Sequence, residues 1–306
     1  MSSEEYPFAL CLTHDVDRPT KTYQAISGAL GALGRGSPLR AGYHLRTLAA
    51  NGDADPYWQF DRILDLETDL GVRSAFYFLD EPSLLRDAPE SLASPRRWIE
   101  HAGRYDPTTG EIADVIRRLD DGGWEVGLHG SYGSPDDPTR LAAEKRALES
   151  VLGHEVSGIR QHHLRLDPAT WRHHAGLGFD YDASLGLTDD VGFAYGYRTQ
   201  EPLSGFQVFP LTAMEIAFPD PGDSYPAAIA ACERLLGEAE REGAVFTALW
   251  HPRLFSEREF PGYSRLYRHL VERALEMGAW VGTPRAYLEE QPLGPLGGAG
   301  RATDSA

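Results

Sequence analysis

The chain has 306 residues, of which 42% are hydrophobic, so it can bury a substantial core in one large domain or two small ones. Acidic residues outnumber basic ones by 46 to 29, and the net charge of −17 argues against nucleic acid or an anionic membrane as a general partner. Cys11 and Cys232 lie in apolar stretches and are predicted to be buried thiols. No apolar run is long enough to span a bilayer and residues 1–6 do not resemble a signal peptide, so we expect a cytoplasmic location without a membrane span.

Short β-rich runs alternate with amphipathic helical ones along the chain, a pattern typical of an α/β fold with parallel strands. Glycines at 71, 153, 243 and 278 are placed where four of the helices would end. The expected strands cover 8–13, 72–79, 124–128, 156–162, 179–184, 206–211, 244–250 and 279–282, and the expected helices cover 58–70, 111–119, 138–152, 168–178, 225–241 and 263–277.

About seven or eight β/α units of this kind predict a distorted (β/α)7–8 barrel, although an open doubly wound sheet would give the same alternation. We expect one barrel domain over 1–290, with insertions at 18–56 and 81–110 and a disordered tail over 291–306. In a barrel, both insertions would emerge at the carboxyl ends of the strands, where they could line a substrate cleft.

Titratable side chains gather at the expected carboxyl ends of several strands. The first strand ends in Thr13-His14-Asp15-Val16-Asp17, and later strand ends carry His129, Arg160, His162 and His251. Because these ends meet at one face of a parallel β/α fold, the side chains are expected to lie close together.

Strand alternation places Asp15 and Asp17 on one side and His14 on the other, so His14 is interpreted as a hydrogen-bonded packing residue. Arg160 and His162 likewise share a side. Carboxylates and imidazoles on one rim suit a divalent metal such as Zn²⁺, and a second carboxylate left off the metal could act as a general base.

The order of these segments, from Phe8 to Leu288, resembles the polysaccharide deacetylase (NodB-homology) family, whose first motif is Thr-Phe-Asp-Asp-Gly. The family fold is a distorted (β/α) barrel, and its members remove acetyl groups from N-acetylated sugars. The resemblance implies that Asp15 is the base, that Arg160 orients it, and that His251 of Leu249-Trp250-His251 is the acid.

This chain departs from the family pattern at its metal ligands. Val16 stands where the first motif has its ligand Asp, so Asp17 is the expected substitute. His129 matches the first ligand of the second motif, His-Ser/Thr-x-x-His, but Gly133 replaces the second. We expect His162 to supply the missing imidazole, which gives a site for a divalent metal such as zinc, formed by Asp17, His129 and His162.

The expected function is therefore a metal-dependent hydrolase that deacetylates an N-acetylated sugar or glycan precursor, such as a lipid- or nucleotide-linked one. Two alternatives stay open: an amidase or esterase that acts on a small non-sugar substrate, and a pseudoenzyme that binds glycan without turnover. The expected partner is a carbohydrate substrate, and the sequence leaves the oligomeric state unspecified.

Overall fold

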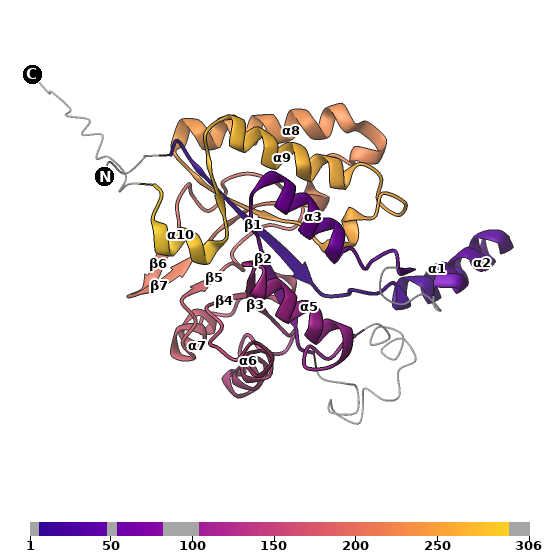
Figure 1. The fold of residues 1–306 in the computed structure, drawn as a ribbon, viewed down its shortest axis with the longest axis horizontal. Helices are drawn as coiled ribbons and strands as arrows, with labels where there is room; N and C mark the ends of the chain where they lie inside the picture. Colours follow the sequence, from indigo (N-terminus) through magenta and orange to yellow (C-terminus); the bar gives the residue numbers. More distant parts are fainter. Residues whose placement is uncertain (1–5, 48–53, 82–103, 294–306) are drawn as a thin grey trace, which may run out of the picture.

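The structure, a computed structural model, describes residues 6–47, 54–81 and 104–293. Most of the expected insertion at 81–110 and of the expected tail at 291–306 therefore lies outside the described residues. Within the described part, ten strands form one sheet in the order β6-β7-β5-β4-β3-β2-β1-β9-β8, with β10 paired to β1. Figure 1 labels β1 to β7 of this sheet. The strands are β1 Ala9–Val16, β2 Ala75–Leu79, β3 Glu125–Gly130, β4 Gly158–Gln161, β5 Tyr181–Asp182, β6 Gln200–Leu203, β7 Phe206–Val208, β8 Leu211–Met214, β9 Val245–Leu249 and β10 Trp280–Gly282.

The two ends of this sheet are brought together by one short run of chain. β7 pairs with β5, and β8, only two residues further on, pairs with β9 at the other end of the strand order. The pairings are parallel except that of β6 with β7. The sheet therefore curls into a mainly parallel barrel, which confirms the predicted fold class.

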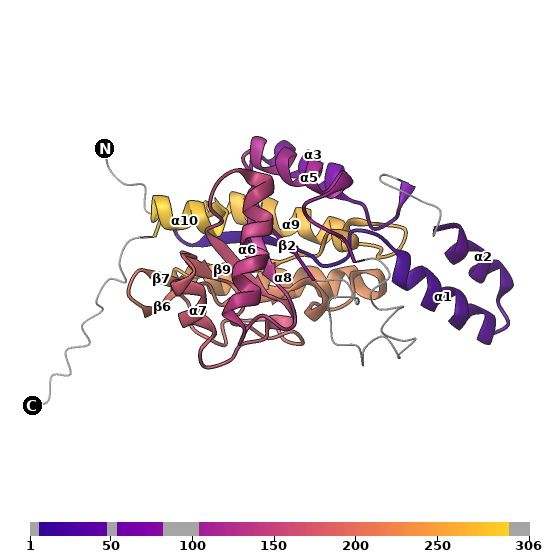
Figure 2. The same ribbon diagram turned by 90° about the horizontal axis from the view of Figure 1, so that it is seen from below.

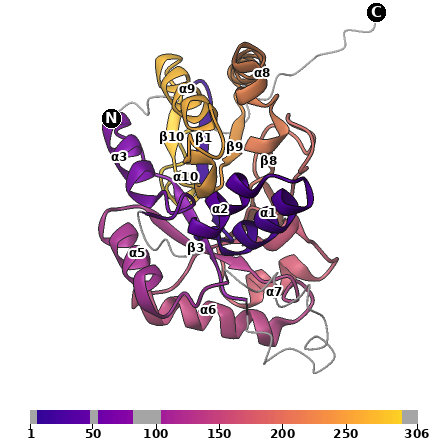
Figure 3. The same cartoon turned by 90° about the vertical axis from the view of Figure 1, so that its right-hand side faces the viewer.

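Most of the described helices cover the outer surface of the curled sheet, and the sequence predicted six of the nine. Figure 3 shows them arranged around the strands. The helices are α1 Thr22–Gly34, α2 Pro38–Thr47, α3 Phe60–Leu70, α5 Gly110–Asp121, α6 Pro138–Leu152, α7 Thr170–Gly176, α8 Pro221–Glu242, α9 Tyr263–Glu276 and α10 Pro284–Glu290.

Local sequence explains where the helices begin and end. α6 begins after Asp137, whose carboxylate accepts hydrogen bonds from the backbone of Thr139 and Arg140. It ends at Gly153, whose φ of 79° is left-handed backbone that a side chain would strain. These two signals are strong in the sequence, and the expected and observed bounds of α6 agree.

Alternation along β1 divides the core into two layers. Leu10, Leu12 and Val16 pack into the large cluster between the sheet and the helices, whereas Ala9 and Cys11 pack in a second cluster. Cys11 and Cys232 are buried and unpaired, as predicted. The same alternation directs Thr13 and Asp15 to the side of Ala9 and Cys11, and His14 to the side of the helices.

Candidate functional site

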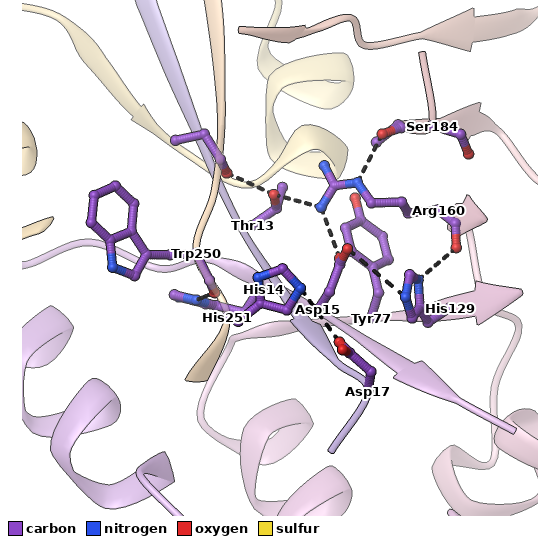
Figure 4. A network of polar contacts seen from close by, with 12 residues as sticks. Thr13, His14, Asp15, Asp17, Tyr77, His129, Arg160, Ser184, Trp250 and His251 are labelled. Atoms are coloured by element: carbon purple, nitrogen blue, oxygen red, sulfur yellow. Dashed lines mark hydrogen bonds and ion pairs between the residues drawn. The ribbon is translucent and has the colours of Figure 1, made fainter. Parts of the chain in front are cut away.

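Asp15 lies buried at the carboxyl end of β1, where Arg160 from β4 holds it. The Arg160 guanidinium donates through Nη1 to Asp15 Oδ1 at 2.9 Å and to Thr13 Oγ1 at 2.8 Å, and through Nε to the Ala183 carbonyl at 2.8 Å. Arg160 is fully buried and Asp15 is 4% exposed, so the pair is shielded from bulk water. Figure 4 shows the Arg160 guanidinium directed at Thr13 and Asp15. The structure thus brings the expected base and its expected orienting residue together, and their roles remain predictions.

His129, on the neighbouring strand β3, presents one ring nitrogen toward Asp15. Its Nδ1 lies 2.9 Å from the Arg160 carbonyl oxygen, and a carbonyl can only accept, so Nδ1 carries the proton. Nε2 is left as the lone-pair nitrogen, 3.9 Å from Asp15 Oδ2. Burial lowers the pKa of His129, which keeps this imidazole neutral.

His162 opens a turn instead of ending a strand. β4 stops at Gln161, one residue before the expected end, and a 3-10 turn follows over His162–Leu164. His163 and Leu164 have φ angles of 59° and 52°, left-handed backbone that is costly for residues other than glycine. The turn places the His162 ring 5.1 Å from that of His129, measured between centroids. Burial lowers the pKa of His162 to about 2, so it too is neutral.

Asp17 forms the second half of the site with His251. Its Oδ1 lies 3.5 Å from His251 Nε2, and its Oδ2 accepts from Arg253 Nη1 at 3.2 Å. His251 Nδ1 is 2.6 Å from Oε1 of the fully buried Glu215. Burial opposes ionisation of Asp17, but His251 and Arg253 outweigh it and lower its pKa. Burial also opposes protonation of His251, and Glu215 outweighs it and raises its pKa.

Glu215 and Arg253 are site residues that the sequence alone did not indicate. Glu215 directly follows β8 (Leu211–Met214), of which only Leu211 fell within an expected strand, the one over 206–211. Leu211-Thr212-Ala213-Met214 is a short and mostly apolar run directly before this carboxylate, so a separate buried strand ending at Met214 was the available signal. Arg253 lies two residues beyond His251, in the turn Pro252–Phe255.

The donor chemistry of Asp17, His129 and His162 suits a divalent metal, but their placement is only partly favourable. Asp17 Oδ1, which lies 3.5 Å from His251 Nε2, and His162 Nδ1 are both buried without a hydrogen-bond partner, so neither donor atom is committed to a hydrogen bond. Within the described part of the chain, however, no three His, Cys, Asp or Glu side chains are gathered closely enough to hold a metal ion. The donor set therefore fits zinc chemically, and a metal would require these side chains to move together.

His14 lies on the opposite side of β1 from this site, as alternation predicted. Its Nδ1 is 2.5 Å from the Trp250 carbonyl oxygen and its Nε2 is 3.0 Å from Glu67 Oε1. Glu67 also accepts from Tyr267, Trp124 and Ser74, at 2.6, 2.7 and 2.9 Å. This buried network links β1 and β9 directly behind Asp15 and His251, so it supports the two halves of the site.

Glu144 of α6 holds the loop that follows His129. It accepts from the Ser131 amide at 3.1 Å and from the Ser131 hydroxyl at 2.5 Å. Burial raises the pKa of Glu144 to about 7, although these hydrogen bonds act in the opposite direction. The loop is therefore anchored to a carboxyl group whose charge is costly in the folded protein.

Glu144→Gln is expected to remove a pH dependence of stability. A carboxyl group whose pKa is higher in the folded state than in the unfolded state adds to the free energy of unfolding. This contribution is complete at a pH below the unfolded pKa and is lost as the pH rises through about 7. Between pH 4 and pH 8, the stability of Glu144→Gln relative to wild type should rise by about 1–3 kcal/mol. Urea unfolding across this range measures it, with the exposed Asp136→Asn as the control, and parallel curves for Glu144→Gln and wild type would contradict it.

Comparisons with known proteins agree with this fold. The sequence matches no protein-family model and no curated protein. The structure is similar to a candidate polysaccharide deacetylase from Mycobacterium smegmatis, with a TM-score of 0.59, 17% identity and coverage of 96% of this chain and 94% of that one. It is similar to a candidate polysaccharide deacetylase from Pseudomonas aeruginosa, with a TM-score of 0.55, 15% identity and coverage of 95% and 94%. It is also similar to PuuE allantoinase, with a TM-score of 0.57, 14% identity and coverage of 94% and 90%.

At these identities the similarity shows a shared fold, so the chain has the (β/α) barrel fold of polysaccharide deacetylase structures. The resemblance expected from the sequence is confirmed at this level. Among the described residues, no helix is long and apolar enough to cross a membrane.

Proposed function

We propose that the protein is a metal-dependent hydrolase that removes an acetyl group from an N-acetylated sugar or glycan precursor. The observation that carries this proposal is the buried Asp15–Arg160 pair, with Asp15 Oδ2 directed toward the lone-pair nitrogen of His129. Next to it, the Glu215–His251 pair faces Asp17. Side chains suited to act as base, acid and metal ligands thus lie together on a fold that solved deacetylase structures share, which supports the proposal.

Each side chain has a distinct proposed role. Asp15, held in place by Arg160, accepts the proton of the attacking water. His251 donates a proton to the departing amine, because Glu215 stabilises its protonated form. Asp17, His129 and His162 would hold the metal, which when bound supplies a Lewis acid for the amide carbonyl.

Purified protein is expected to contain about one divalent metal ion per chain. Asp17→Ala and His129→Ala should each lose most of it, because each removes one of three proposed ligands. Elemental analysis after dialysis measures this. His154→Ala, which removes an exposed histidine bound to Asp120, should keep the metal. Wild-type protein without stoichiometric metal would contradict the proposed metal dependence.

A hydrolase of small non-sugar amides is a second candidate, favoured by the similarity to PuuE allantoinase. Acetate release from a panel of N-acetylated sugars would support the deacetylase. Turnover of small amides or esters, including allantoin, without acetate release from any sugar would favour this second candidate.

A pseudoenzyme that binds glycan is a third candidate, favoured by Gly133 at the second-motif position and by the lack of a three-donor group among the described residues. Glycan binding without turnover, unchanged in Asp15→Asn, would favour it.

A further inference from the structure

Helices α1 and α2 form a hairpin that has an unusual charge for this protein. The sequence from Arg18 to Gly52 contains no aspartate or glutamate, although the whole chain has 46 acidic residues. The same segment contains five basic residues: Arg18, Lys21, Arg35, Arg40 and Arg46. A local positive charge is thus built into a chain with a net charge of −17.

Three of these arginines lie exposed on the surface of the hairpin. Lys21 is paired with Glu259 at 2.5 Å, but Arg35, Arg40 and Arg46 are exposed and have no acidic partner among the residues that the structure describes. A cavity of about 430 Å³ is lined by Arg35, Arg40, Tyr43, His44, Arg258 and Glu259. Burial lowers the pKa of His44, and Lys21, Arg40 and Arg35 lower it further against the opposing charge of Glu259.

The hairpin buries small residues and exposes large ones. Ala25, Ala29 and Ala32 on α1 are at most 4% exposed, whereas Leu30 and Leu33 are 60% and 56% exposed. On α2, Leu39 is 91% exposed and Leu45 is 52% exposed. Elsewhere in the described chain, no leucine is more than 39% exposed. Single exposed leucines need no explanation, but four on one hairpin are a local concentration of apolar side chains that the described residues leave uncovered.

The apolar and basic residues meet at the turn of the hairpin. α1 ends at Gly34 and α2 begins at Pro38, so Leu33 and Arg35 lie on one side of the turn and Leu39 and Arg40 on the other. The two helices are closely packed, because a Cβ on Gly28 would lie 2.8 Å from the His44 ring. This arrangement of leucines flanked by arginines is typical of elements that lie in the interface of a membrane.

The base of the hairpin is attached next to the candidate site. The Lys21 amide donates to Asp55 at 3.0 and 3.1 Å, and Tyr43 donates to Glu259, in the segment that follows Arg253. Figures 1 and 2 show α1 and α2 projecting beyond the carboxyl end of β1, where Asp15 and Asp17 lie. A partner bound to the hairpin would therefore lie opposite the carboxyl ends of the strands.

We propose that the α1–α2 hairpin docks on a bilayer that contains anionic lipid, with its leucines entering the interface and Arg35, Arg40 and Arg46 contacting the headgroups. The acidic remainder of the chain does not prevent this, because exposed charges beyond about 8 Å are largely screened at physiological salt. A second copy of the hairpin is a poorer partner, since a two-fold contact would place its arginines against those of the first.

Vesicle flotation tests the proposal on the full chain. Wild-type protein should float with phosphatidylcholine vesicles that contain phosphatidylglycerol, bind pure phosphatidylcholine much more weakly, and dissociate at high salt. Arg35→Glu/Arg40→Glu and Leu33→Asp/Leu39→Asp should each lower binding at least about tenfold. The matched controls Arg234→Glu/Arg241→Glu on α8 and Leu275→Asp on α9 should bind like wild type, and circular dichroism checks that every variant is folded.

A fluorescent label tests insertion directly. Cys11 and Cys232 are buried, so a dye sensitive to polarity can be attached selectively at Leu39→Cys, with Leu275→Cys as its control. Only the dye at position 39 should shift to the blue with anionic vesicles.

Failure of wild-type protein to bind these vesicles would overturn the proposal, as would equal loss of binding in the controls. A dimer in solution that Leu33→Asp/Leu39→Asp dissociates would assign the surface to a second copy instead. Neither readout depends on hydrolysis, so the result is independent of the proposed function.

Discussion

Asp15→Asn is expected to lower kcat for the proposed hydrolysis by about two to four orders of magnitude, with little change in KM. The amide cannot accept a proton from water, while it still fits the space beside Thr13 and Arg160. The change also leaves the buried guanidinium without its countercharge, which should destabilise the fold by about 3–5 kcal/mol. Steady-state kinetics below the melting temperature of the variant separates the two effects.

Asp55→Asn is the matched control for this substitution. Asp55 is 2% exposed and accepts hydrogen bonds from the Lys21 and Tyr57 amides, but it contacts none of the proposed catalytic residues. It should cost stability and leave kcat near that of wild type. If Asp15→Asn retained kcat within an order of magnitude of wild type, Asp15 would not be the base.

Glu67→Ala is expected to cause the largest loss of stability among single substitutions outside the site. Its carboxylate is bonded to His14, Ser74, Trp124 and Tyr267, all buried or nearly so. A buried polar group left without a partner costs about 1–3 kcal/mol, so the total should reach about 4 kcal/mol or more. We expect the melting temperature to fall by about 10 °C, measured by circular dichroism.

Two further variants sharpen the test of Glu67. Glu67→Gln keeps the volume and one acceptor oxygen, so its loss of stability should lie between that of Glu67→Ala and zero. Asp65→Ala removes an exposed carboxylate from the same helix and should change little. A loss below about 1 kcal/mol in Glu67→Ala would mean that water replaces the carboxylate as the partner of these donors.

The sequence predicted secondary structure best where a local signal sets the end of an element. Asp137 and Gly153 define α6 without help from the rest of the chain, and Gly71 and Gly243 end α3 and α8 in the same way. The sequence predicted the strand bounds less well where the pairing of strands sets them. The run over 206–211 was expected as one strand, but Phe206–Val208 pairs with β5 and Leu211–Met214 pairs with β9. Which neighbour a short apolar run joins depends on barrel closure, which periodicity does not encode.

At the site, the sequence by itself determined which side chains reach the carboxyl ends of the strands and which side of β1 each one faces. The Asp15 side chain points toward Arg160 and the His14 side chain toward Glu67, and both directions follow from alternation in an extended strand. The contacts that turns and loops make with the site side chains were decided only by the tertiary structure. Glu215 reaches His251, Arg253 reaches Asp17, and His162 approaches His129 through turns whose backbone follows no period. The division has a physical cause: repeating backbone geometry fixes the direction of a side chain locally, whereas a turn directs it through contacts that form only when distant segments pack together.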